Sequence, residues 1–183
     1  YICGAYQFLG KYYKEADGTI ITGLDILDLY TENPGTSYPR LIGNVAIEVD
    51  RSLFIVNSKK RFSTMSHEPL TINIVGFENH GGRTYLGKNI KPFAKVIKGF
   101  GNNGVDRTEG AIYKNSFGSY LHGPILPKNP EFADLLIKLA IQKKYRKEID
   151  LSALDDFLEI KARENILQKL NIKQYLNNIR SVF

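Results

Sequence analysis

The stretch that decides the fold is the first ten residues, Tyr1-Ile2-Cys3-Gly4-Ala5-Tyr6-Gln7-Phe8-Leu9-Gly10. An apolar pair leads into a cysteine, and two small residues then open a run whose apolar positions fall near helical spacing. This order predicts a strand, a nucleophile and a helix joined by a cramped turn, as in the nucleophile elbow of α/β hydrolases. Because a helix N-terminus favours negative charge, the position also favours the reactive thiolate form of Cys3.

The residue after the cysteine has a predicted role of its own. The amide N–H of Gly4 would point toward the oxyanion that forms when Cys3 attacks a carbonyl group. The competing interpretation is an inert cysteine packed in a strand, which is the fate of most lone cysteines. On spacing alone the two interpretations are evenly balanced.

A nucleophilic cysteine needs a base, and a candidate lies in Ser119-Tyr120-Leu121-His122-Gly123-Pro124. The imidazole of His122 follows a predicted strand and precedes two residues that stop regular structure. Active sites of α/β proteins gather at such strand ends, so His122 favours the catalytic interpretation of Cys3. The alternative is a histidine that only closes a strand by bonding to its backbone.

The composition sets wider limits. A chain of 183 residues is long enough for one domain with a core, and no apolar stretch approaches the roughly 20 residues of a membrane span. The single cysteine excludes an internal disulfide and fits a reducing compartment, and three histidines are too few for an all-histidine metal cage. The net charge of +6 comes from scattered basic residues without a nucleic-acid-binding motif, so we expect a solvated basic surface and no nucleic-acid partner.

Strand and helix signals alternate along the chain, which indicates the α/β class. We expect a helix at residues 4–13, extended pieces at 20–21 and 24–29, strands at 45–49, 72–77, 96–97, 111–113 and 117–121, a turn at 101–104, and a helix at 156–170. Another helix is expected to start with Asn129 as N-cap and Pro130 in first position. Its core-facing side is predicted to carry Phe132, Leu135, Leu136, Leu139 and Ala140. Residues 50–69, which include His67, are polar and predict a surface insertion.

Four segments, in this order, resemble motifs of class I glutamine amidotransferases. They are residues 2–10, Phe77-Glu78-Asn79-His80-Gly81-Gly82-Arg83-Thr84, Gly101-Asn102-Asn103, and residues 118–124. The resemblance is to the branch that includes cobyric acid synthase, and within it to GatD-like glutaminase subunits of lipid II isoglutaminyl synthase. It covers nearly the whole chain apart from the insertion. It implies a flavodoxin-like, three-layer α/β/α fold, with residues 1–183 forming the C-terminal part of one amidotransferase domain.

The resemblance also implies a function in peptidoglycan biosynthesis. A GatD-like subunit hydrolyses L-glutamine to glutamate and ammonia in the cytoplasm. A Mur-ligase-like partner of the MurT type uses ATP to activate the α-carboxyl of D-glutamate in the lipid II stem peptide, and ammonia converts that acid to D-isoglutamine. We therefore expect a heterodimer, with no cofactor or metal in this chain and ATP on the partner. The alternatives are a cobyric- or cobyrinic-acid amidotransferase glutaminase domain and a non-catalytic scaffold.

Site residues follow from the same resemblance. Cys3 would form a thioester, His122 would move the protons, and Gly4 would supply one oxyanion donor. The implied substrate-binding residues are Gln7, Arg40, Asn79 and His80. Without the resemblance, Arg40 would be assigned to a loop surface, whereas its guanidinium suits the substrate carboxylate. The segment Glu78-Asn79-His80 is expected to be a loop lining the glutamine pocket, with His80 not serving as the base.

The sequence departs from the family pattern in three places. Ala5 stands where the family usually has a second glycine, and one methyl group is expected to be tolerated. Pro124 stands where an acid often follows the catalytic histidine, so we expect a Cys–His dyad unless a carboxylate from elsewhere orients His122. The family domain begins well before its nucleophile, so we expect this sequence to lack its natural N-terminal strands and one oxyanion donor.

Overall fold

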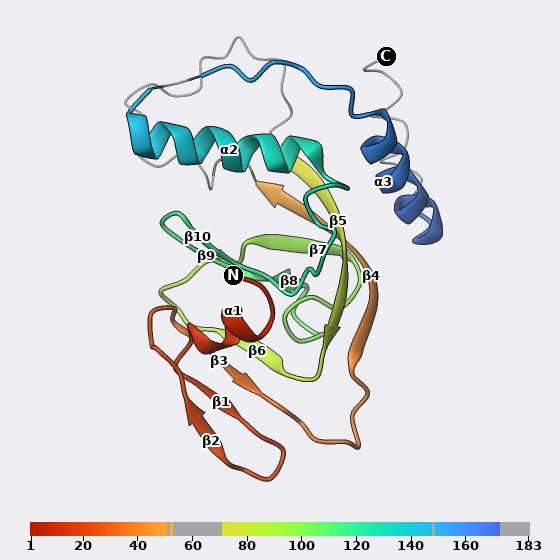
Figure 1. Cartoon of the computed structure of the whole chain (residues 1–183). Coiled ribbons are helices and arrows are strands. Elements are labelled where there is room, and N and C mark those ends of the chain that lie inside the picture. Colours follow the sequence, from red (N-terminus) through yellow and green to blue (C-terminus); the bar gives the residue numbers. More distant parts are fainter. Residues whose placement is uncertain (51, 53–70, 148, 173–183) are drawn as a thin grey trace.

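The computed structural model describes residues 1–50, 52, 71–147 and 149–172 (Figure 1). The predicted insertion, His67 included, therefore lies outside the described residues except for Asp50 and Ser52. One sheet has the order β5-β4-β7-β8, formed by Thr71–His80, Leu41–Asp50, Ala94–Lys98 and Thr108–Glu109. A second has the order β2-β1-β3-β6, formed by Ile20–Thr22, Tyr12–Lys14, Leu29–Glu32 and Arg83–Leu86.

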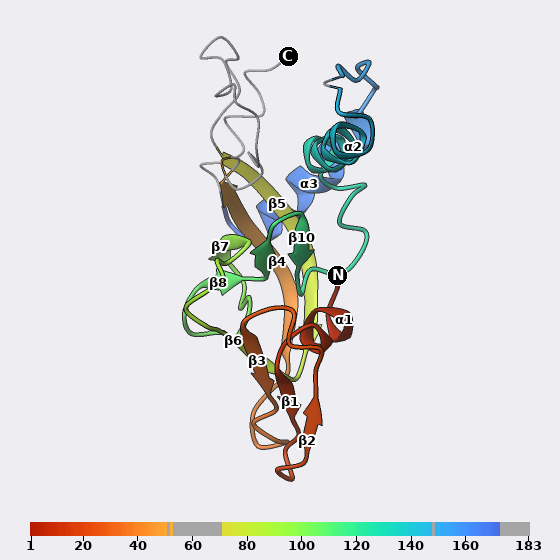
Figure 2. The ribbon, with the colours of Figure 1, turned by 90° about the vertical axis from the view of Figure 1, so that its left-hand side faces the viewer.

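Three helices and a hairpin accompany these sheets in the described part of the chain. The helices are α1 (Gly4–Phe8), α2 (Pro130–Tyr145) and α3 (Phe157–Lys169), and the hairpin pairs β9 (Ala111–Tyr113) with β10 (Ser116–Gly118). The β1–β2 hairpin lies at the opposite end of the molecule from α2 (Figures 1 and 2). No helix among the described residues is long and apolar enough to span a membrane.

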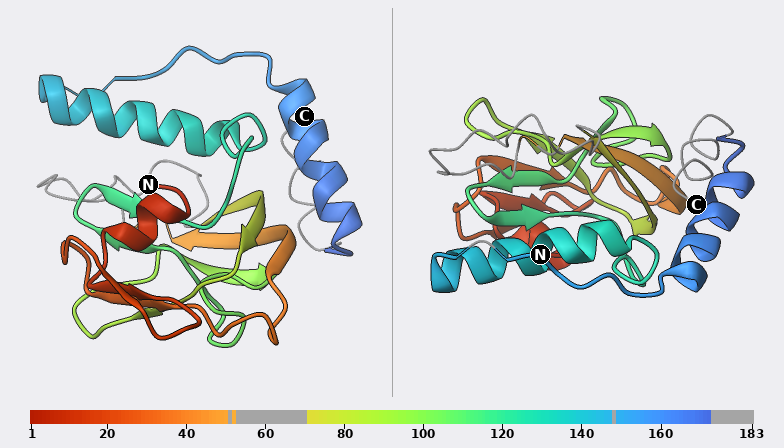
Figure 3. Two further views of the ribbon diagram at one scale, coloured as in Figure 1. Left: turned by 60° about the horizontal axis from the view of Figure 1, so that its bottom comes forward. Right: turned by 90° about the horizontal axis from the view of Figure 1, so that it is seen from above.

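Successive side chains of β4 point to opposite faces of the sheet, and those of its central part are buried on both faces. Val45 and Ile47 belong to a core cluster that includes Phe132 of α2. Between them, Ala46 belongs to another cluster, with Ile166 of α3. The two long helices, α2 and α3, thus pack against opposite faces of the β5-β4-β7-β8 sheet. Figure 3 shows both helices beside this sheet.

The predicted α/β class is confirmed, since mixed sheets are combined with helices. Residues 20–21, 45–49, 96–97 and 111–113 lie in strands, and residues 157–169 are helical, as the sequence predicts. Phe132 is buried, and Leu135, Leu136 and Leu139 pack on the same core, which confirms most of the predicted helix face.

Two sequence predictions, for the first helix and for residues 78–80, are wrong. The first helix ends at Phe8 and not near Tyr13, because the chain turns at Gly10, where a Cβ atom would come within 2.3 Å of Leu29 Cδ1. The segment Glu78-Asn79-His80 is the end of β5 and not a loop. The ladder between β4 and β5 continues to the pair Leu41–His80, which keeps these residues extended.

Asn129 precedes α2, and Pro130 begins it, as predicted, but the Asn129 side chain makes no capping bond. Its side-chain Oδ1 atom instead accepts from the Val75 backbone N–H at 2.9 Å, and its Nδ2 atom donates to the Val75 carbonyl oxygen at 2.8 Å. Val75 pairs with Ala46 of β4 on one side, and β5 is the end strand of its sheet on the other. Asn129 therefore satisfies the edge of the sheet and fixes the start of α2 against it.

Candidate active site

Cys3 has the backbone conformation of a nucleophile elbow. Its φ of 51° and ψ of −114° are rare for a residue with a side chain, and α1 begins at the next residue. The flanking segment is held by bonds from the Cys3 amide to the Ser119 carbonyl at 2.9 Å and from the Ser119 amide to the Tyr1 carbonyl at 3.0 Å. Strain of this kind persists only where surrounding structure holds it, and it is typical of active sites.

The same bonds bring His122 to the end of a neighbouring strand. Ile2 and Ser119 form a parallel bridge, and three residues later the His122 amide donates to the Phe77 carbonyl at 2.7 Å. The segment 117–122 therefore lies between residues 1–3 and β5. Cys3 and His122 thus follow parallel strand segments at the same end, which is where α/β active sites form. His122 Nε2 is buried, and no hydrogen-bond partner for it lies among the described residues.

A hollow of about 240 Å³ begins at Gly4, the residue after Cys3. It is lined by Gly4, Gln7, Phe8, Tyr13, Glu15, Ile21 and Gly23. No other part of the described chain comes within 4 Å of the position that a Cβ atom on Gly4 would take. The space over the start of α1 is therefore open to a small molecule, and Gln7, one helical turn beyond Cys3, forms part of its wall.

Arg40 is exposed and fastened to the end of β5. Its Nε and Nη2 atoms donate to Asn79 Oδ1 at 3.1 and 3.0 Å. A Cβ atom on Gly81 would lie 3.2 Å from Arg40 Nη1, and one on the next residue, Gly82, would lie 2.9 Å from Gln7 Nε2 and 3.1 Å from Tyr13 Cε2, two groups of the pocket wall. Asn79 thus positions Arg40 near the pocket, and direct substrate binding by either residue stays a prediction.

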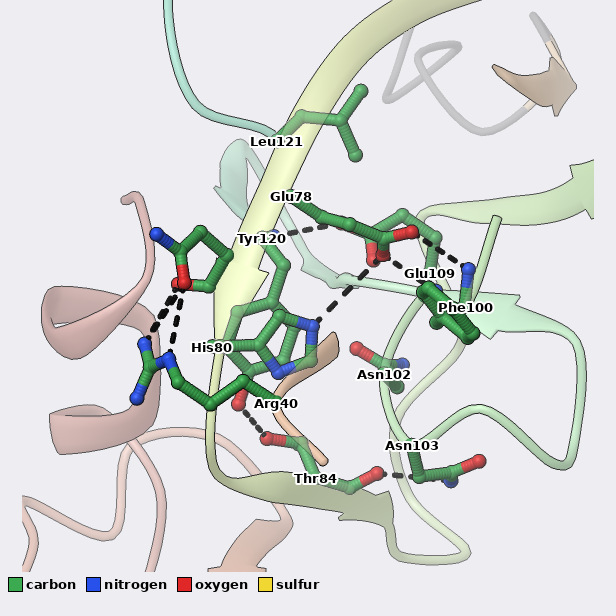
Figure 4. A network of polar contacts seen from close by, with 12 residues as sticks. Arg40, Glu78, His80, Thr84, Phe100, Asn102, Asn103, Glu109, Tyr120 and Leu121 are labelled. Carbon is green, nitrogen blue, oxygen red and sulfur yellow. Dashed lines mark hydrogen bonds and ion pairs between the residues drawn. The ribbon is translucent and has the colours of Figure 1, made fainter. Parts of the chain in front are cut away.

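His80 is 2% exposed and lies behind the pocket. Its ring stacks on that of Tyr120, with centroids 3.5 Å apart and planes 7° apart, and its Nδ1 atom bonds to the Gly82 carbonyl at 2.8 Å (Figure 4). Direct contact between His80 and substrate stays a prediction, and the burial favours a supporting role. Sequence reasoning did not single out Tyr120, although it belongs to the His122 motif.

Glu109 supports the strand that leads to His122. Its Oε1 atom accepts from Ser119 Oγ and from the Tyr120 amide, each at 2.7 Å. Complete burial, and to a smaller extent the nearby Glu78, raise the pKa of Glu109 to about 7 against the opposing effect of these hydrogen bonds. Figure 4 shows the side chains of Glu78 and Glu109 together at one side of the stacked His80 and Tyr120 rings.

This buried acid predicts a pH-dependent stability. Between the ordinary pKa of 4.5 and the folded-state value of about 7, the folded protein holds a proton that the unfolded chain releases. The stabilisation of the folded state by protonated Glu109 is therefore fully present below the pKa of the unfolded chain. It is lost as the pH rises through the pKa of the folded protein. We expect Glu109→Gln to remove this dependence, which amounts to about 3 kcal/mol. Urea unfolding at acidic and alkaline pH measures it, with Glu48→Gln as control; an unchanged pH dependence in Glu109→Gln would contradict the prediction.

Within residues 1–50, 52, 71–147 and 149–172, no three His, Cys, Asp or Glu side chains are grouped so that they could hold a metal ion.

Comparison with known proteins agrees with this arrangement. The model of the CobB/CobQ-like glutamine amidotransferase domain matches residues 1–130. The chain is 44% identical over 174 residues to the lipid II isoglutaminyl synthase (glutamine-hydrolyzing) subunit GatD of Staphylococcus aureus, across 93% of this chain and 60% of that protein. It is 41% identical to the corresponding Streptococcus pneumoniae subunit, across 86% of this chain and 53% of that protein. A probable cobyric acid synthase of Methanocaldococcus jannaschii is 33% identical, across 86% of this chain and 29% of that protein. The chain thus spans a little more than half the length of the two GatD proteins.

Proposed function

Because this chain belongs to the CobB/CobQ-like glutamine amidotransferase family, we propose that it hydrolyses glutamine to glutamate and ammonia, with Cys3 as nucleophile and His122 as general base. The observation that carries the proposal is the strained backbone of Cys3 at the start of α1, beside the strand segment that ends in His122. An inert structural cysteine has no need of φ 51°.

In the proposed reaction, the Cys3 sulfur attacks the carboxamide carbon of glutamine bound in the hollow. The Gly4 amide donates to the oxyanion of the tetrahedral intermediate. His122 carries the proton that the departing nitrogen takes up, so that ammonia leaves and a thioester remains. Water, deprotonated by His122, then attacks the thioester carbon. The C–S bond breaks, glutamate is released, and the proton on His122 restores the Cys3 thiol.

The orientation of His122 is the incomplete part of this site. Gly123 and Pro124 follow it, so the sequence provides no acid two residues later. Its Nε2 atom lacks a hydrogen-bond partner in the described part of the chain. We infer that His122 works as one half of a dyad in this chain and that a carboxylate on the partner subunit orients its ring through Nδ1, because the Nε2 atom is buried within this chain.

We propose that the ammonia passes to a Mur-ligase-like, MurT-type partner, which holds ATP and amidates D-glutamate in lipid II in the cytoplasm. Identities of 44% and 41% to two GatD subunits, against 33% to a cobyric acid synthase, support this acceptor. The test supplies the complex with ATP, lipid II and glutamine labelled with ¹⁵N in its amide. We expect the label in D-isoglutamine; label in a corrinoid acceptor alone would support the cobyric acid alternative.

The glutaminase step has a separate test. A thiol-reactive glutamine analogue should label Cys3 in the natural polypeptide, excess glutamine should protect it, and the Cys3→Ala variant should remain unlabelled. Labelling that glutamine does not slow would show a reactive thiol outside a glutamine site, and absence of labelling would support the scaffold alternative.

Arg40 is predicted to bind substrate and not to take part in the chemistry. Arg40→Ala removes charge-assisted hydrogen bonds to the glutamine carboxylate, worth about 1.5–3 kcal/mol, so KM should rise roughly 10- to 100-fold with little change in kcat. Steady-state ammonia release measures both constants. The matched control is Arg107→Ala. The Arg107 guanidinium bonds to carbonyl groups of β7, which is separated from β5 by β4. An unchanged KM would return Arg40 to the surface-loop interpretation.

A further inference from the structure

A chain of hydrogen bonds runs from the pocket wall into the core behind it. Gln7 Nε2 donates to the Tyr120 hydroxyl at 2.9 Å. That hydroxyl lies 2.5 Å from Thr84 Oγ1, which in turn lies 2.7 Å from Thr31 Oγ1. Tyr120, Thr84 and Thr31 have no exposed surface, whereas Gln7 lines the hollow beside Cys3. The chain therefore connects a pocket residue to three groups that no substrate can reach.

One arrangement of the protons satisfies the whole chain of hydrogen bonds. Either oxygen of the Tyr120–Thr84 and Thr84–Thr31 pairs can be the donor. Because Tyr120 accepts from Gln7 and carries one proton of its own, an arrangement in which Tyr120 donates to Thr84 and Thr84 donates to Thr31 uses every hydroxyl proton of the chain. Burial raises the pKa of Tyr120 well above its ordinary value, so the hydroxyl keeps its proton at any working pH. Tyr120 thus offers a lone pair to the Gln7 side chain and directs its proton away from it.

The Tyr120 ring is itself held in place. His80 stacks on one of its faces, and Tyr6 packs edge-on with centroids 5.4 Å apart. Figure 4 shows His80 against Tyr120, with the Tyr120 hydroxyl joined to Thr84. Gly82, whose carbonyl holds His80, also closes against the Gln7 amide, since a Cβ atom there would lie 2.9 Å from Gln7 Nε2. The amide nitrogen is therefore confined between Tyr120 and Gly82.

We propose that Tyr120 is a positioning residue for substrate, which fixes the Gln7 amide with its nitrogen toward the core and its carbonyl oxygen available to an N–H donor of bound glutamine. This inference rests on the proposed glutaminase function. An unrestrained amide can present either its oxygen or its NH₂ group, and only the oxygen accepts. Holding one orientation in advance removes part of the ordering cost of binding.

The proposal gives the end of β5 a double role. Asn79 and His80 are consecutive, so their side chains leave opposite faces of the strand. Asn79 fastens Arg40, and His80 supports the ring that fastens Gln7. One strand end thus places two residues that are expected to contact the substrate.

The test replaces the hydroxyl without removing the ring. Tyr120→Phe should raise KM for glutamine about 3- to 10-fold, the value of one hydrogen bond, with kcat changed less than about twofold. Calorimetric titration of glutamine into Cys3→Ala and Cys3→Ala/Tyr120→Phe should show the same rise in Kd. The matched control is Tyr6→Phe, which removes a buried hydroxyl of the same core that bonds to Asn102 and not to Gln7. We expect its KM and Kd to stay within about twofold of the parent values.

A double-mutant cycle separates positioning from a general loss of packing. Adding Tyr120→Phe to Gln7→Ala should change KM less than about twofold, because the amide that Tyr120 positions is gone. Thr84→Val, which removes the acceptor of the Tyr120 proton, should also raise KM, and Thr84→Ser should restore it. Effects of Tyr120→Phe and Gln7→Ala that multiply, or unchanged KM and Kd in Tyr120→Phe and Thr84→Val, would overturn the inference. Parent protein that neither binds nor hydrolyses glutamine would overturn the proposed function instead.

Discussion

Cys3→Ala should lower glutamine hydrolysis by at least about 10³-fold while the protein stays folded, because the substitution removes the attacking sulfur and little packing. Cys3 is only partly buried, at the edge of a core cluster. Glutamate formation measures the loss, and circular dichroism with urea unfolding checks the fold. Ala5→Ser, two residues further on in α1, is the control for a change in the elbow that keeps the sulfur. Ammonia release near the parent rate in Cys3→Ala would remove Cys3 from the mechanism.

The same position offers a test that needs no substrate. At φ 51° and ψ −114° a Cβ atom is strained, whereas glycine accepts positive φ readily. Cys3→Gly should therefore be more stable than Cys3→Ala by about 1–2 kcal/mol, although glycine also gains entropy in the unfolded chain. Equal or lower stability of the glycine variant in urea would show that the elbow stores no strain.

The elbow and part of the segment that leads to His122 could be predicted because both are encoded locally; the strand predicted at 117–121 ends at Gly118, and Ser119 and His122 form isolated bridges. An apolar pair, a cysteine and two small residues favour a tight turn into a helix as much as a cysteine within a strand, the His122 motif favours the turn, and Gly123-Pro124 stops the segment that carries His122. The length of α1 could not be predicted in this way. Its apolar spacing continues to Tyr13, but contact between Gly10 and Leu29 turns the chain, and Leu29 lies in another strand.

The support behind the pocket could not be predicted because it is assembled from distant segments. Thr31 and Thr84 meet through the antiparallel register of β3 and β6, and Tyr120 arrives from the His122 segment. Each is an ordinary residue in its own neighbourhood, and only the register places their hydroxyls in a row. His80 shows the converse: its motif was recognisable, but its burial against Tyr120 depends on how β5 passes behind the pocket.

His122→Ala should lower kcat by about 10²- to 10⁴-fold, the usual range for a lost general base, with a smaller effect on KM. The variant should remain folded, because the strand segment is held by the His122 amide and not by its side chain. Steady-state ammonia release gives both constants. The informative comparison is His80→Phe, which keeps an aromatic ring against Tyr120 and should act mainly on KM. A kcat loss in His80→Phe as large as that in His122→Ala would show that the assignment of His122 as the base is wrong.

The second half of this prediction concerns the effect of the proposed partner subunit on His122. The sequence has no acid two residues after His122, so a carboxylate from the proposed partner should orient the ring and raise kcat when the complex forms. Orientation can help only a base that is present. Adding the ligase subunit should therefore stimulate the parent protein and Arg40→Ala by similar factors and leave His122→Ala unstimulated. Ammonia release with and without the partner measures this, and equal stimulation of His122→Ala would mean that the partner acts on the pocket or on the fold rather than through His122.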